Sequence, residues 1–368
     1  MMEALHRVLD QFMGRGHAAV TVPPLDGALK PNNRLEDAAP HLTIDAPDNL
    51  VSAGSYLVFS SGSTVYRLSK TSDAPAVLYQ ADGPVTALAG RDDGTVAVAC
   101  DGGGIVLLTE TGDPTCLDRL GNRTATCVTA MAFAPDDGLV IAVGSAVHGA
   151  ADWRHDLMTH GRSGSLWRAT PSTGEAVCLH EGLAFPNGLC AKGDGSILVS
   201  EAWTSRILRL SPDGAVSVLL DDLPGYPARM SPAENGGVWL SVFAPRSQLI
   251  ELVLREPAYR KAMMAQVEPD YWVCPALRSG VSFLEPMQGG ALKQMGILKP
   301  WAPTRSYGLA IEYDADFVPL QSLHSRAGGR HHGITAAIER NGRLWLTSKG
   351  GDAVLSVDLN DAPTEALS

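Results

Sequence analysis

The chain of 368 residues is long enough for a large hydrophobic core, but its length leaves the number of domains open. Its formal net charge of −11 argues against a nucleic-acid or anionic-membrane partner, because either partner would need a cluster of basic residues. The six cysteines are scattered and lack the paired spacing of a zinc site or of a dense disulfide framework.

The N-terminal stretch, MMEALHRVLDQFMGRG, spaces its apolar residues as an amphipathic helix does and lacks the apolar core of a signal peptide. We predict a short helix here, followed by a lead-in segment, so that residues 1–40 precede a single domain over residues 41–368. No apolar run in the sequence reaches the roughly 20 residues of a membrane span. We therefore expect a soluble, cytoplasmic protein.

From Pro47 onward the sequence repeats one pattern, which consists of an entry turn, a short apolar strand, a turn with Asp or Gly, and a second strand. The six copies begin at Pro47, Pro84, Val128, Phe185, Tyr226 and His332. Most intervals are about 40 to 55 residues, the period of a four-stranded propeller blade. We predict an all-β, six-bladed β-propeller. A pair of β-sandwiches is the alternative, but it does not explain why the entry turns are alike.

Two blades carry extra segments. The interval after Tyr226 is about twice as long as the others, and residues Leu252 to Met264 have a helical pattern, which predicts a partly helical insertion in blade 5. In blade 3, residues Ala146 to Gly164 form a long excursion that we interpret as a lid, with His148 and Trp153 available to a substrate. A solvated surface loop is the alternative for this excursion.

A propeller brings its six entry segments together at one mouth of the central channel, because the innermost strand of every blade lines that channel. In LAFPNGL the entry of blade 4 holds Pro186-Asn187-Gly188, which is typical of a tight turn. The corresponding positions in the other blades are Asp48, Thr86, Thr129, Ala228 or Arg229, and His332 to Thr335. We expect Asn187 both to shape its turn and to face the channel.

Four segments follow one another along the chain, namely GRSGSLWRATPSTGE, LAFPNGL, SEAWTSRILRL and DLPGYP. In these segments the chain resembles the strictosidine synthase-like and SMP-30/gluconolactonase-like six-bladed propellers. Lactonases of this superfamily hold a divalent cation, usually calcium, at the channel mouth. The resemblance implies that Asp48 and Asn187 take two of the ligand positions. Thr129 and Ala228 stand at the other two, with Arg229 beside them, so we expect calcium to bind weakly or not at all.

The strictosidine synthase branch uses a glutamate at the entry of its last blade, and the resemblance puts Thr335 at that position. A threonine cannot act as the base for an amine proton, so we do not expect strictosidine formation. We predict that Thr335 and Thr129 contact the substrate. In GGRHHGIT, His331 or His332 can activate water, and Arg229 can stabilise an oxyanion. A histidine satisfied by structural hydrogen bonds is the alternative.

The functional hypotheses all involve a small molecule in the channel. The first is a hydrolase of the lactonase or esterase kind that acts on a small cyclic or ester-like substrate. The others are a metal-independent lyase, isomerase or condensing enzyme of secondary metabolism, and a propeller that binds without catalysis. A phosphate-binding glycine loop and a GxSxG elbow are both absent from the sequence, which argues against ATP use and serine-hydrolase chemistry. We expect Glu201, on a blade 4 strand, to satisfy buried polar groups.

Overall fold

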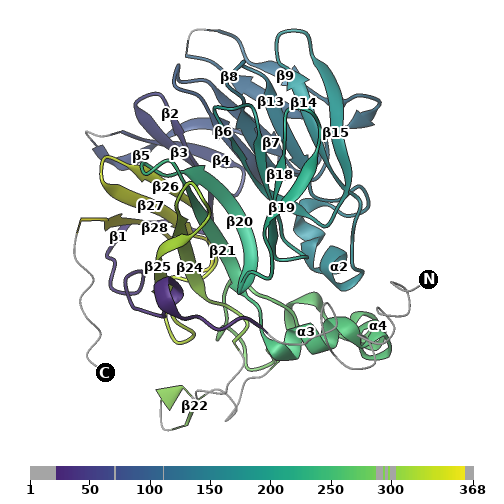
Figure 1. Ribbon diagram of the computed structural model, residues 1–368, viewed down its shortest axis with the longest axis vertical. Helices are drawn as coiled ribbons and strands as arrows, with labels where there is room; N and C mark the ends of the chain where they lie inside the picture. Colours follow the sequence, from purple (N-terminus) through teal and green to yellow (C-terminus); the bar gives the residue numbers. More distant parts are fainter. Residues whose placement is uncertain are drawn as a thin grey trace.

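The strands form six four-stranded antiparallel sheets that are arranged as the blades of a propeller (Figure 1). The computed structural model describes residues 22–69, 72–110, 112–286, 293–294, 297–298 and 304–360. The predicted N-terminal helix lies outside these residues. The six-bladed fold predicted from the repeats is confirmed, and each blade is a simple meander whose neighbouring strands pair in chain order.

The first three blades each consist of one continuous piece of chain. Blade 1 contains β2 (Pro47–Ala53), β3 (Tyr56–Ser61), β4 (Thr64–Ser69) and β5 (Ser72–Gln80). Blade 2 contains β6 (Val85–Gly90), β7 (Val96–Cys100), β8 (Ile105–Leu108) and β9 (Thr115–Leu117). Blade 3 contains β12 (Val128–Phe133), β13 (Leu139–Val143), β14 (Gly164–Thr170) and β15 (Glu175–Leu183). The short hairpin between blades 2 and 3 contains β10 (Arg119–Leu120) and β11 (Arg123–Thr124).

The last three blades include the closure of the ring. Blade 4 contains β16 (Pro186–Ala191), β17 (Ile197–Glu201), β18 (Arg206–Leu210) and β19 (Val216–Leu220). Blade 5 contains β20 (Gly225–Pro232), β21 (Val238–Pro245), β24 (Gly308–Tyr313) and β25 (Pro319–Ser325). Blade 6 contains β26 (Ile334–Arg340), β27 (Arg343–Ser348), β28 (Ala353–Asp358) and β1 (Pro40–Thr43). Because β1 pairs with β28, the two ends of the propeller are joined within one sheet.

Two insertions carry the α-helices of the described residues. In blade 3, η3 (Ala150–Asp152) and α2 (Trp153–Met158) lie between β13 and β14. In blade 5, α3 (Gln248–Arg255), α4 (Pro257–Gln266), η4 (Pro269–Tyr271) and the two-residue strands β22 (Lys293–Gln294) and β23 (Ile297–Leu298) lie between β21 and β24. This confirms the helical insertion predicted for blade 5. The two insertions share one buried cluster, which includes Leu157 of α2 and Ile250 of α3.

The hydrophobic core is divided among the blade interfaces. Each pair of neighbouring blades encloses one cluster of small and branched apolar side chains, as strands with buried faces require. The lead-in segment also joins the core, since Leu35 is fully buried in the cluster between blades 5 and 6. Its single-turn helix η2 (Gly27–Leu29) lies against β25. Among the described helices, none is both long and apolar enough to cross a membrane.

Candidate functional site

The innermost strand of every blade has a register shift near its start. The residues at these shifts are Asn49 and Leu50, Thr86, Thr129, Asn187, Ala228 and Arg229, and Thr335. A β-bulge leaves its extra residue outside the regular ladder and changes the direction of its side chain. The sequence therefore identified the positions in blades 2 to 5, while in blade 1 the shift begins one residue after Asp48 and in blade 6 it falls on the last residue of the expected range. The expected turns are bulges. Pro186-Asn187-Gly188 is not a tight turn, because it begins β16, and the left-handed residue is Phe185, with φ of 58°.

One cavity of about 350 Å³ opens over these bulges. Six of the residues predicted from the sequence line it, namely Asp48, Thr129, Trp153, Asn187, Arg229 and Thr335. They come from blades 1, 3, 4, 5 and 6, and Thr86 of blade 2 also lines the cavity. The volume lies within the range of small-molecule sites in proteins, which is about 300–1,000 Å³. The convergence expected of a propeller thus holds for the entry positions, although they are far apart in the sequence.

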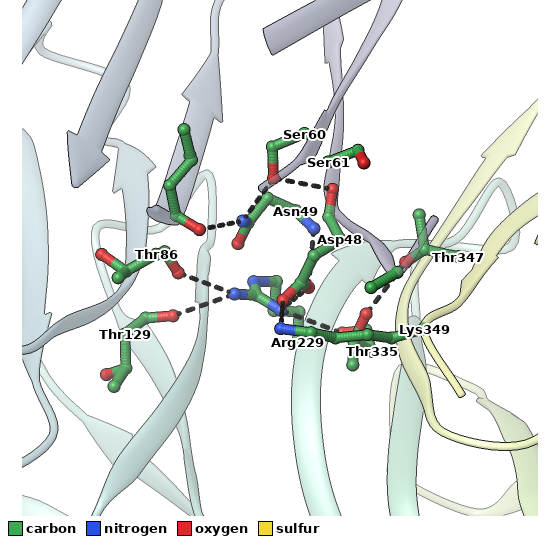
Figure 2. Close-up of polar contacts among 12 residues, drawn as sticks. Asp48, Asn49, Ser60, Ser61, Thr86, Thr129, Arg229, Thr335, Thr347 and Lys349 are labelled. Atoms are coloured by element: carbon green, nitrogen blue, oxygen red, sulfur yellow. Dashed lines mark hydrogen bonds and ion pairs between the residues drawn. The ribbon is translucent and has the colours of Figure 1, made fainter. Parts of the chain in front are cut away.

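The guanidinium group of Arg229 lies at the centre of the bulged residues (Figure 2). Its Nη1 donates to Asp48 Oδ1 at 2.7 Å and to the Thr335 carbonyl oxygen at 3.5 Å. Its Nη2 donates to the carbonyl oxygens of Thr86 at 2.9 Å and Thr129 at 3.4 Å. Arg229 belongs to blade 5, so one side chain joins it to blades 1, 2, 3 and 6. Its side chain is 14% exposed.

Asp48 is paired with a second cation. Lys349 Nζ donates to Asp48 Oδ2 at 2.7 Å, while Asp48 Oδ1 accepts from Arg229 and from the Asn49 backbone N–H. Burial alone would raise the pKa of Asp48, but the charges of Arg229 and Lys349 hold it well below its ordinary value. Asp48 is therefore an ionised anchor for two cations. Such a carboxylate is a poor general base near neutral pH.

These residues do not fit a divalent cation. Both carboxylate oxygens of Asp48 accept from cationic side chains, and the nearby carbonyl oxygens are bonded to the same guanidinium. Calcium needs six to eight oxygen ligands and favours several carboxylates. Within the described part of the chain, His, Cys, Asp and Glu form no group of three that can hold a metal ion. The sequence expectation for Asp48 and Asn187 as metal ligands is therefore not supported by the geometry of this chain.

Asn187 lines the cavity, as the sequence suggested, but it also has a structural role. Its Nδ2 donates to the Pro227 carbonyl oxygen at 3.2 Å, which connects blade 4 to the entry of blade 5. Its neighbour Gly188 packs closely against β20 of blade 5. A Cβ atom at this position would lie only 2.2 Å from the Ala228 carbonyl oxygen. The bulge at Asn187 therefore requires glycine at the next position.

A second set of cavity residues comes from the turns between the second and third strands of the blades. Asp101 follows β7, Trp203 follows β17 and Lys349 follows β27. In a meander the end of the second strand lies beside the start of the first, so these turns reach the same channel mouth as the bulges. The sequence analysis missed Asp101 and Lys349. Their shared position, directly after the second strand of a repeat, was the signal that could have found them.

Aromatic side chains form one wall of the cavity. The wall consists of Trp153, Phe185, Trp203 and Phe243. Phe185 stacks on Trp203 with ring centroids 4.5 Å apart, and Trp153 contacts Phe243 edge to face at 5.6 Å. Trp203 Nε1 donates to Asp156 Oδ1 of α2 at 2.7 Å, which ties the wall to the blade 3 insertion. Trp153 thus reaches the cavity from the segment that the sequence analysis interpreted as a lid.

The histidines expected to act as a general base are not at the cavity. His331 and His332 are buried and do not line it. Nδ1 of His332 lies 2.7 Å from Ser306 Oγ and Nε2 lies 2.8 Å from the Arg326 carbonyl oxygen, so hydrogen bonds satisfy both ring nitrogens. Burial lowers the pKa of His332. The residue at the blade 6 bulge is Thr335, three positions later.

His148 is also absent from the cavity lining. Its ring lies parallel to that of His155, with centroids 6.1 Å apart, within the blade 3 insertion. The contact expected between His148 and a substrate therefore has no support in the cavity geometry.

Comparison with known proteins places the chain in a family. A family model described as the SMP-30/Gluconolactonase/LRE-like region matches residues 53–242. The adipocyte plasma membrane-associated protein of Salmo salar is 23% identical over 218 residues, which cover 57% of this chain and 46% of that protein. The strictosidine synthase-like 10 protein of Arabidopsis thaliana is 26% identical over 191 residues, which cover 51% of this chain and 45% of that protein. The matches span less than half the length of these relatives.

Solved structures share the fold over most of the chain. A gluconolactonase from Xanthomonas campestris has a TM-score of 0.56 at 14% identity, covering 92% of this chain and 95% of that one. A regucalcin from Agrobacterium tumefaciens, described as a calcium-binding protein, has a TM-score of 0.54 at 13% identity, covering 87% and 93%. At these identities the likeness concerns the fold. Because the family model matches more than half of the residues and the propeller fold agrees with it, the chain belongs to the SMP-30/gluconolactonase/LRE-like family.

Proposed function

We propose that the protein hydrolyses a small lactone or ester in the central cavity, with Lys349 and Asp101 as its catalytic residues. The observation that carries this proposal is an ammonium group and a carboxylate in one cavity with an aromatic wall. Membership in a family with gluconolactonase-like folds supports the reaction class. Family membership alone does not specify the substrate.

Lys349 is suited to bind the reacting oxygen. Its side chain is 33% exposed, and one of its three N–H donors is used by Asp48, so two donors are available to a ligand. Arg229 is less suited, because four of its hydrogen-bond contacts are to the protein. We therefore assign Arg229 a positioning role through Asp48, in place of the oxyanion contact expected from the sequence.

Asp101 is suited to accept a proton from water. It lines the cavity, and its carboxylate has no hydrogen bond or ion pair with another described residue. In the proposed reaction, water attacks the carbonyl carbon while its proton passes to Asp101, and Lys349 stabilises the oxyanion. The carbon–oxygen bond to the leaving alkoxide then breaks, and Asp101 returns the proton to that alkoxide. A lactone and one water thus give one hydroxy acid.

The aromatic wall indicates the kind of substrate. Trp153, Phe185, Trp203 and Phe243 offer ring surfaces to an apolar or aromatic part of the molecule. We therefore expect substituted lactones or aryl esters to react better than small polar sugar lactones of the same ring size.

The test is an assay of the purified protein on lactones and esters that differ in ring size and aromatic substitution. Lys349→Met and Asp101→Asn should each lower kcat/KM by about 10²-fold or more. The matched controls Lys192→Met and Asp194→Asn, which lie outside the cavity, should retain the wild-type value. Unchanged turnover in both cavity variants would overturn the assignment. Saturable binding without turnover of any compound would overturn hydrolysis and favour a binding propeller.

A further inference from the structure

The oxygens around Arg229 form a cation site, and the cation in it is the guanidinium group of Arg229 itself. They are one carboxylate oxygen, from Asp48, and three backbone carbonyl oxygens, from Thr86, Thr129 and Thr335. We propose that Arg229 occupies this site as a built-in cation, and that replacing Arg229 with an acidic residue converts the site into one for calcium. This inference depends on the contacts of Arg229 and is independent of the proposed hydrolysis.

Three of the four oxygens belong to the backbone and not to flexible side chains. Thr86, Thr129 and Thr335 are the bulged residues of blades 2, 3 and 6, so their carbonyl groups leave the regular ladder and converge on one guanidinium group. Figure 2 shows the carbonyl groups of Thr86 and Thr129 on one side of Arg229 and Asp48 on the other. Backbone carbonyls and carboxylates are ligands that calcium prefers.

The charge balance explains why the wild-type site should reject a divalent cation. Asp48 contributes one negative charge, while Arg229 and Lys349 each contribute a positive charge. The cluster is therefore positive by one unit. Arg229→Asp changes it to negative by one unit and adds a second carboxylate on a shorter side chain, which leaves the space of the guanidinium group to the ion. Calcium should bind better than magnesium, because magnesium demands a smaller and more regular shell of ligands.

Arg340 provides a matched control elsewhere in the propeller. Its Nη1 donates to the Tyr56 carbonyl oxygen at 2.9 Å and its Nη2 to the Gly54 carbonyl oxygen at 3.0 Å. It has carbonyl partners, as Arg229 does, but in the described residues it has no carboxylate partner. Arg340→Asp thus introduces the same side chain at a carbonyl-rich position that lacks an equivalent of Asp48.

The experiment measures calcium binding by isothermal titration and the thermal midpoint with and without calcium. As purified, the wild-type protein should contain no stoichiometric calcium, and after chelator treatment its midpoint should not respond to added calcium. Arg229→Asp should bind one calcium ion with a Kd of about 10⁻⁴ to 10⁻³ M. Arg340→Asp should not bind at these concentrations. Arg229→Asp/Lys349→Met should bind about tenfold more tightly, because the remaining cation is gone.

Two results would overturn the inference. One is stoichiometric calcium in the wild-type protein, since Arg229 would then not occupy the cation site. The other is a folded Arg229→Asp variant, verified by circular dichroism, that binds calcium no better than Arg340→Asp. If Arg229→Asp does not fold, Arg229→Asn supplies a neutral oxygen ligand at the same position and is subject to the same comparison. None of these readouts requires turnover, so failure here is distinguishable from failure of the proposed hydrolysis.

Discussion

Asp48 is the residue on which the charged end of the cavity depends. A buried carboxylate is costly without partners, and a buried cation is equally costly once its partner is removed. Here one carboxylate compensates Arg229 and contacts Lys349, and both cations hold Asp48 ionised. The three side chains therefore form one charge network, and the substitution of one should change the electrostatic environment of the other two.

This dependence can be tested through pH. Asp48→Asn should lower the free energy of unfolding at pH 7 by about 3 kcal/mol, because it leaves two cations without their carboxylate. The folded-state pKa of Asp48 lies below its unfolded value of about 3.9, so its stabilising effect is present above that pH and is lost as the pH falls. The difference between wild type and variant should therefore shrink as the pH drops below about 4.

Urea unfolding at several pH values measures this difference. Asp194→Asn is the control, since Asp194 forms an exposed ion pair with Arg209. Asp194→Asn should lower the free energy of unfolding by much less than Asp48→Asn does. If the difference in unfolding free energy between wild type and Asp48→Asn stays constant down to acidic pH, Asp48 is not the ionised anchor of the two cations.

At the scale of elements, the blade 3 insertion is held against the ring of blades by tertiary contacts. The helix α2 has only six residues, too few to be stable through its own hydrogen bonds, so tertiary contacts must hold it. Those contacts include buried Leu157 and Met158 and the bond from Trp203 to Asp156. Glu201, at the end of β17, has the structural role expected from the sequence, since it accepts from the Ala184 backbone N–H and from Arg206.

The link between Trp203 and α2 gives a second prediction. Trp203→Phe keeps an aromatic ring in the wall but leaves the buried carboxylate of Asp156 without its donor, which should cost about 1–3 kcal/mol of unfolding free energy. Trp153→Phe is the matched control, because the indole of Trp153 has no hydrogen-bond partner among the described residues. Chemical denaturation should show the larger loss for Trp203→Phe, and equal losses would contradict the link.

At the scale of the whole molecule, the ring is closed by the N-terminal part of the chain. The outer strand of blade 6 is β1, and the segment before it also contributes to the core between blades 5 and 6 through Leu35. The division between residues 1–40 and residues 41–368 remains a prediction. The described residues from 22 to 39 nevertheless contact the propeller, for example through Asn32 Nδ2, which donates to the Ser322 carbonyl oxygen.

The burial of Leu35 between blades 5 and 6 makes this residue a test of whether the lead-in segment helps to close the ring. Leu35→Ala should destabilise the protein by about 2–5 kcal/mol, because it leaves a cavity in a fully buried cluster. Leu320→Ala on β25, where the side chain is 49% exposed, should change stability by less than about 0.5 kcal/mol. Thermal unfolding of both variants measures the contrast. If Leu35→Ala were as mild as its control, the lead-in segment would be an appendage and not part of the core.

Much of the fold could be read from the sequence because its signals are local and repeated. The strand pattern, the entry positions and the helical pattern after Tyr226 each occupy a short window, and six similar windows indicate a ring of blades. The ring of blades in turn predicted which residues lie at the channel mouth. Asp48, Asn187 and Arg229 were therefore placed near one another without knowledge of any contact.

The contacts themselves were decided only by tertiary structure. Asp48 is 181 positions from Arg229 and 301 positions from Lys349, and no local pattern connects them. The bulge at the start of β26 places Thr335 at the cavity, while His332, two residues before that strand, contacts Ser306. The sequence alone thus determined a six-bladed ring with polar residues at one mouth. The packing of that ring decided that a guanidinium lies at the mouth among oxygens of four blades.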